Sequence, residues 1–112
     1  MNKITAVIRL DKLKDVQTAL IKSGIVGMTA IDVQGYGRQR GHTASYRGAK
    51  HAVEFHPKVR LEVVVTTDQT HYTINTIVTA AQTGVIGDGK IFVSPIDQTV
   101  RIRTQEEGHD AL

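Results

Sequence analysis

Alternating apolar positions predict a strand over residues 58–65. Val59, Leu61, Val63 and Val65 are apolar at every second position, which is the period of a strand that buries one face. Other runs rich in apolar and β-branched residues predict further strands. These strands are expected at residues 4–10, 25–33 and 90–96, with a short fifth strand at 98–103.

Two segments have apolar residues spaced three or four apart, as on one face of an amphipathic helix. The first begins after Asp11, a residue type that caps helices, and ends at Gly24. The second begins after Thr67 or Asp68 and ends at Gly84. The predicted buried faces consist of Leu13, Val16, Ala19 and Leu20 in the first helix, and of Ile74, Ile77, Val78 and Ala81 in the second.

The predicted elements repeat the order strand, helix, strand. Two such units favour an α+β fold of the ferredoxin-like kind, a four-stranded antiparallel sheet with both helices on one face. The length of 112 residues fits a single domain. The second face of the sheet would remain uncovered in a lone chain and expose an apolar patch of a size that is rare on monomers. We therefore expect the chain to form oligomers.

Composition excludes several classes of protein. The chain has no cysteine, which excludes disulfides and thiolate chemistry. It has no apolar run of membrane-spanning length and no apolar core of a signal peptide near Met1, so a cytoplasmic protein is expected. The net charge is +3, and six Lys/Arg against the single acidic Glu54 lie within residues 36–60. That segment favours anionic ligands or partners.

A glycine-rich segment, Thr83-Gly84-Val85-Ile86-Gly87-Asp88-Gly89-Lys90, precedes the predicted strand at 90–96. Successive backbone N–H groups in such a loop can form an anion-binding nest, with a lysine charge at its mouth. The alternative is purely structural, with Gly84 ending a helix and the later glycines forming a turn. The loop is not a Walker A motif, because that motif continues into Lys-Ser/Thr and a helix.

Residues 34–57 form an unusually long segment without apolar periodicity. A loop of this length inside a small domain is usually functional. Few apolar anchors offset the entropy of ordering residues 37–55, so we expect that stretch to lack a fixed conformation without a partner. The five histidines of the chain fit no compact metal-ligand motif, and no catalytic triad or nucleophile–base pair is evident.

Several motifs together resemble the PII nitrogen-regulatory signal-transduction proteins. TGVIGDGKIFV at 83–93 looks like the C-terminal signature of that family, and GYGRQRGHT at 35–43 resembles the start of its long T-loop. YRGA at 46–49, PKV at 57–59 and RIRTQEEG at 101–108 also fit. The resemblance covers nearly the whole chain as one domain, residues 1–112. It places the T-loop at about 37–55, the B-loop at about 82–90 and the C-terminal loop at about 102–112.

The resemblance implies a homotrimer that binds ATP or ADP in the clefts between subunits. The phosphates would contact Gly87, Asp88, Gly89 and Lys90 of one subunit. Arg38, Arg101 and Arg103 would lie near the phosphates as further cations. The residues implied around the adenine and ribose are Thr29, Gly35, Glu62 and Val64. From the residues alone, Arg101 and Arg103 can reach the glycine-rich loop of the same or of a neighbouring subunit.

The family also binds 2-oxoglutarate beside Mg-ATP, which implies that Gln39 helps hold Mg²⁺ and that Lys58 pairs with the distal carboxylate. Its T-loop docks on target proteins, among them membrane ammonium transporters. Here the contact residues would be Tyr46, Arg47 and His51, with Arg47 at the tip as the candidate pore plug. His51 replaces the modifiable tyrosine of the family. We hypothesise that its imidazole makes target binding pH-dependent; the alternative is an inert surface histidine.

The sequence leaves three classes of function open. The resemblance favours a non-enzymatic sensor of ATP and ADP. A phosphotransferase-like enzyme on a ferredoxin-like scaffold and a basic nucleic-acid binder are the alternatives. The chain also departs from the family pattern at Arg9-Leu10-Asp11, where Lys-Pro-Phe is usual, and at Ala49, where some relatives have a phosphorylated serine.

Overall fold

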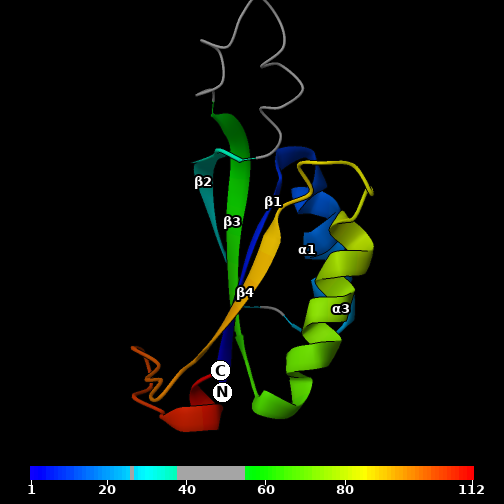
Figure 1. Cartoon of the computed structure of the whole chain (residues 1–112). Helices are drawn as coiled ribbons and strands as arrows, with labels where there is room; N and C mark the ends of the chain where they lie inside the picture. The colour runs from blue at the N-terminus through cyan, green and yellow to red at the C-terminus, as the bar shows by residue number, and fades with distance from the viewer. Residues whose placement is uncertain (26, 38–54) are drawn as a thin grey trace, which may run out of the picture.

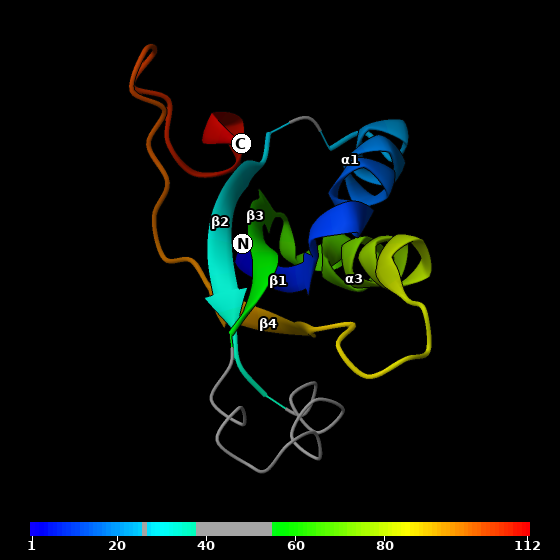
Figure 2. The same cartoon turned by 90° about the horizontal axis from the view of Figure 1, so that it is seen from above.

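In the part of the chain that the structure describes, a four-stranded antiparallel sheet is covered on one face by two helices (Figures 1 and 2). The computed structural model describes residues 1–25, 27–37 and 55–112. The strand order is β2-β3-β1-β4, which confirms the predicted ferredoxin-like fold. The elements are β1 (Asn2–Arg9), α1 (Leu13–Lys22), β2 (Thr29–Gly35), β3 (His56–Val65), α3 (Thr70–Ala81) and β4 (Lys90–Pro95).

The core lies between the sheet and the two helices. Every second residue of β1 and β3 is buried, as the alternation predicts, and these side chains meet the inner faces of α1 and α3. The prediction is wrong for Val78, which is 39% exposed at the rim of α3. The buried core consists of Ile4, Ala6, Ile8, Val16, Leu20, Val59, Leu61, Val63, Val65, Ile77 and Ala81.

Both helices are entered through a 3-10 turn, so the predicted side-chain caps are wrong. Asp11 lies inside the turn Leu10–Lys12, and Thr67 and Asp68 lie inside the turn Thr67–Gln69. Neither helix has a side-chain cap hydrogen bond. A 3-10 turn tightens the backbone at a helix end and provides local partners for groups that a cap would otherwise serve.

Several predicted boundaries also change. The first strand covers residues 2–9 rather than 4–10, the second ends at 35 rather than 33, the third begins at 56 rather than 58, and the fourth ends at 95 rather than 96. The second strand begins at Thr29 rather than at Ile25, because the Ile25 N–H donates to the Leu20 carbonyl and its side chain packs against the core. The helix before the glycine-rich loop ends at Ala81, so Gly84 lies within the loop rather than at the helix end. Gly24, with a φ of 93°, follows α1 as predicted.

The predicted fifth strand at 98–103 is wrong. After β4 the chain leaves the sheet and folds back on itself, with the Gly108 N–H bound to the Thr99 carbonyl and a single β-bridge between Val100 and Glu107. Ile102 at the turn is 95% exposed. This segment has strand-like composition but has no neighbouring strand among the residues that the structure describes.

The sheet face opposite the helices carries both apolar and charged residues. Ile31 is 37% exposed and Phe92 57% exposed, and Glu62 forms ion pairs with Lys3 and Arg60 at 3.9 and 3.5 Å. None of the helices in the described ranges is long and apolar enough to span a membrane.

Candidate functional site

The glycine-rich loop joins α3 to β4 and packs closely against β1. Gly84, Gly87 and Gly89 have φ values of 84°, 110° and 98°, in the left-handed region that other residues rarely adopt. A Cβ on Gly89 would lie 1.7 Å from the Val7 carbonyl oxygen. The sequence requirement for glycine is therefore both conformational and steric at position 89.

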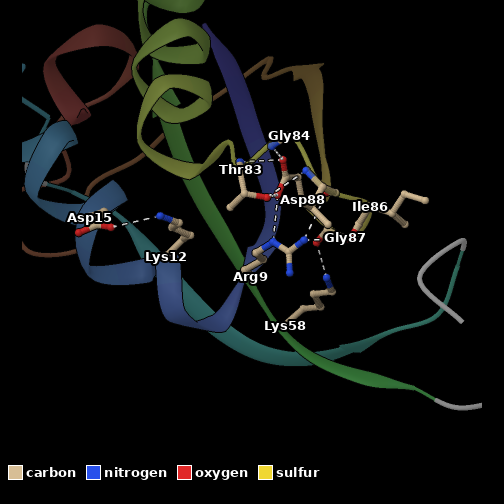
Figure 3. A network of polar contacts seen from close by, with 10 residues as sticks. Arg9, Lys12, Asp15, Lys58, Thr83, Gly84, Ile86, Gly87 and Asp88 are labelled. Atoms are coloured by element: carbon tan, nitrogen blue, oxygen red, sulfur yellow. Dashed lines mark hydrogen bonds and ion pairs between the residues drawn. The ribbon is translucent and has the colours of Figure 1, made fainter. Parts of the chain in front are cut away.

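The Asp88 carboxylate lies at the centre of the loop (Figure 3). Its Oδ1 accepts a bond from Arg9 Nε at 2.9 Å and another from the Thr83 hydroxyl. Its Oδ2 accepts from the backbone N–H groups of Thr83 and Gly84, both at 2.8 Å. The Thr83 hydroxyl, followed by the Arg9 guanidinium, holds the pKa of Asp88 well below its ordinary value. The side chain thus stays ionised and binds groups of its own chain.

Two cations bind the carbonyl oxygens of the same loop. Arg9 Nη2 donates to the carbonyls of Ile86 at 2.9 Å and Val85 at 3.3 Å, and Lys58 Nζ donates to the carbonyl of Gly87. Arg9 and Lys58 are direct partners in the β1–β3 register. Burial, followed by the charge of Arg9, lowers the pKa of Lys58.

Sequence reasoning missed the part of Arg9 in this site. The sequence places Arg9 at the end of a strand, and its loop partner Asp88 is 79 positions away. The sequence offered one signal, namely that Arg9 is charged and continues the series of alternate, less buried positions of β1. The pairing becomes evident only once the strand register is known.

A cavity of about 630 Å³ opens beside the loop. Its volume falls in the range of small-molecule sites. The rings of Tyr36 and Phe55 lie beside each other, with their centroids 5.5 Å apart. In the sequence, Tyr36 lies shortly before residues 38–54 and Phe55 directly after them. The cavity is lined by Val7, Gly35, Tyr36, Gly37, Lys58, Phe92 and residues 85–90.

The structure brings some of the predicted site residues together and separates others. Gly35, Lys58 and the loop residues 87–90 line one cavity. Thr29, which pairs with Glu62, is six positions from Gly35 along β2. At the ordinary rise of a strand that separation is about 20 Å. Val64 is two residues beyond Glu62 on β3, still further from the cavity.

Arg101 and Arg103 lie in the folded-back C-terminal segment, at the end of the sheet opposite to the loop between α3 and β4 (Figure 1). Arg101 donates to Glu106 at 3.2 Å and to the Leu112 carbonyl at 2.8 Å. Arg101 therefore does not reach the glycine-rich loop of its own chain. The other predicted site residues, Arg38, Gln39, Tyr46, Arg47 and His51, lie outside the described residues.

The described ranges contain no group of three or more His, Asp or Glu side chains that could hold a metal ion. Asp88 is the carboxylate nearest to the centre of the loop, and its oxygens are engaged by Arg9, Thr83 and Gly84.

Comparison with known proteins gives consistent matches along the whole chain. The family model described as "Nitrogen regulatory protein P-II" matches residues 1–106. Proteins of that name from Pasteurella multocida and from Microchaete diplosiphon are 53% and 50% identical over 112 residues, covering all of both chains. The crystal structure of Arabidopsis thaliana PII bound to citrate superposes with a TM-score of 0.83 at 40% identity, covering 99% of this chain and 91% of that one.

Proposed function

Because this chain belongs to the family of nitrogen regulatory P-II proteins, we propose that it is a signal-transduction regulator that binds ATP or ADP without turning it over. The nucleotide occupies a cleft between subunits of a homotrimer. Its binding changes the conformation of the T-loop, residues 37–55, which docks on a target protein.

The division of the predicted site residues between two ends of one sheet carries this proposal. Gly35 and the glycine-rich loop line one cavity, whereas Thr29 lies about 20 Å from Gly35 along β2 and Arg101 belongs to the C-terminal segment, where it binds Glu106 and Leu112. A site made from both requires two copies of the chain, each using a different surface. Head-to-tail contacts generate closed rings when the rotation between neighbouring copies closes, and open filaments when it does not. A trimeric ring is the assembly that the resemblance to PII proteins implies.

The chemistry of the loop suits a polyphosphate. Its carbonyls bind Arg9 and Lys58, and the charge of Lys90 follows directly after Gly89. We propose that Lys90 and Arg38 of one subunit and Arg101 and Arg103 of the next neutralise the phosphates. Gln39 would help to hold Mg²⁺, which would supply further neutralisation of the phosphate charge.

A dicarboxylate site beside the phosphates forms part of the same proposal. The Lys58 residue is 7% exposed and lines the cavity, and among the described residues its ammonium donates to a neutral carbonyl, that of Gly87. A carboxylate can replace this carbonyl with a stronger, charge-assisted bond. We propose 2-oxoglutarate as the ligand, and the Arabidopsis PII bound to citrate supports the choice of a polycarboxylate.

The target contact follows from the T-loop. We propose that Tyr46, Arg47 and His51 at its tip bind a membrane transporter from the cytoplasmic side, with an ammonium transporter as the first candidate. Nucleotides regulate this contact only if ATP and ADP bind the docking and non-docking conformations of the T-loop with different affinity.

Isothermal titration of ATP, ADP and 2-oxoglutarate, combined with analytical ultracentrifugation, tests the proposal. We expect a trimer, binding of both nucleotides, and binding of 2-oxoglutarate that requires Mg-ATP. A stable monomer, or a trimer that binds neither nucleotide at millimolar concentration, would contradict it. Rapid release of phosphate or transfer of a phosphoryl group would instead favour the phosphotransferase alternative. Salt-dependent binding of DNA or RNA would favour a nucleic-acid binder.

A further inference from the structure

We propose that Arg9 and Asp88 are positioning residues of the phosphate loop. They turn the carbonyl oxygens of residues 85–87 toward β1 and β3, and so leave the loop N–H groups for a bound polyphosphate. This inference rests on the proposed nucleotide function and deepens it. It gives the Asp88 side chain a different part from the direct phosphate contact that the family resemblance implies.

The hydrogen-bonding capacity of Asp88 is already used within the loop. An ionised carboxylate has about four acceptor positions. Four donors take them, namely Arg9 Nε, the Thr83 hydroxyl and the backbone N–H groups of Thr83 and Gly84. A phosphate oxygen is itself an acceptor with negative charge, so it gains nothing from this side chain. Asp88 instead links the start of the loop to β1.

Arg9 continues this link to the carbonyls in the middle of the loop. Its Nε binds Asp88, and its Nη2 binds the carbonyls of Val85 and Ile86 (Figure 3). The Arg9 and Asp88 side chains are 22% and 24% exposed, so the pair is largely shielded from solvent. Lys58 binds the next carbonyl, that of Gly87. Three successive carbonyls therefore point toward two cations.

The orientation of the N–H groups follows from peptide geometry. In a trans peptide the C=O and the following N–H point in opposite directions, and the described residues contain no cis peptide. The N–H groups of Ile86, Gly87 and Asp88 therefore point away from Arg9 and Lys58. No described residue accepts a hydrogen bond from these three groups. Adjacent free N–H groups of this kind form an anion-binding nest.

The loop needs such an anchor because glycines flank Asp88. Gly87 and Gly89 allow the peptide planes on either side to adopt many orientations. A contact that fixes only the position of the loop would leave those planes free. The bonds from Arg9 and Lys58 fix the direction of three carbonyls, and thereby the direction of the N–H groups that would face the phosphates.

Titration of ATP and adenosine into a set of single variants tests the positioning role. Arg9→Met removes the three bonds of the guanidinium, and Asp88→Asn removes the charge and half of the acceptor capacity of the carboxylate. We expect both variants to bind ATP at least ten-fold more weakly than the parent, with adenosine affinity unchanged within two-fold. Arg9→Lys should recover most of the ATP affinity, because an ammonium group still reaches the carbonyls.

Asp15→Asn is the matched control. Asp15 forms an exposed ion pair with Lys12 at 3.8 Å, away from the loop (Figure 3), and this variant should bind ATP like the parent. If Arg9→Met and Asp88→Asn are folded and also bind ATP like the parent, the positioning role is wrong and the proposed function stands. Equal losses of ATP and adenosine affinity would show general damage to the fold and also overturn the role. A parent protein that binds no nucleotide refutes the proposed function itself.

Discussion

Arg9 and Lys58 oppose each other across strands β1 and β3, and both donate hydrogen bonds to carbonyl oxygens of the loop between α3 and β4. The strand register thus places two positive charges beneath one short loop. Because like charges repel, the arrangement requires compensation, and the Asp88 carboxylate bound to Arg9 supplies part of it. Of the two cations, Lys58 also lines the adjoining cavity.

Gly89→Ala should distort the loop and weaken nucleotide binding. The added Cβ would lie 1.7 Å from the Val7 carbonyl oxygen, at a φ of 98°. Strain of this kind costs on the order of 1–3 kcal/mol of folding free energy. If the loop moved to relieve the clash, it would separate from β1. Urea denaturation and ATP titration measure the two effects. Gly84→Ala is the control, because it also has positive φ but open space around the new methyl group.

Gly84→Ala should reduce the free energy of unfolding less than Gly89→Ala does. The expected loss is about 1–2 kcal/mol, which comes from the left-handed conformation alone. Equal losses in the two variants would show that the close approach of Gly89 to β1 has no energetic consequence.

Lys90→Ala and Arg103→Ala should each weaken ATP binding by about 1–3 kcal/mol, the scale of a hydrogen bond to a charged group. Both residues are exposed, so the trimer should persist, which ultracentrifugation can check. Lys14→Ala on the exposed side of α1 is the control for the loss of one positive charge. Normal ATP affinity in both variants would place the phosphate site elsewhere.

Glu106→Gln should strengthen nucleotide binding at low salt. Glu106 accepts a hydrogen bond from Arg101 at 3.2 Å and so competes with a phosphate for that cation. The pair is exposed, and such pairs contribute no more than about 1 kcal/mol, so the gain should not exceed roughly five-fold. Titration at two salt concentrations measures it. Glu107→Gln, one residue further, serves as the control, and an equal gain there would indicate a general charge effect.

The stability contributed by Asp88 should be lost in acid. The pKa of Asp88 is lowered in the folded protein, so its contribution is present above the ordinary carboxyl pKa of about 4 and is lost as the pH falls through the lower folded value. The difference in unfolding free energy between the parent and Asp88→Asn should therefore be largest near neutral pH and shrink below about pH 4. A difference that does not vary with pH would contradict the ionised network.

Local sequence patterns determined most of the elements of this protein. The alternation of Val59, Leu61, Val63 and Val65 and the helical spacing of Val16 and Leu20 predicted buried faces correctly, because these periods follow from the geometry of one strand or one helix. The glycine-rich segment likewise predicted a special loop. The same local reasoning failed at 98–103, because a strand exists only when another strand lies beside it.

Tertiary structure alone decided how the site is built. The Arg9–Asp88 pair joins residues 79 positions apart, and only the register of β1 with β3 places Lys58 beside them. The sequence motifs point to Thr29, Gly35, Glu62 and Lys90 together. The strand register instead pairs Thr29 with Glu62 and Gly35 with His56, six positions apart along β3, and it pairs Lys90 with Val7 on the other side of β1. Periodicity carries information over one element, whereas contacts between distant elements depend on how the whole sheet pairs.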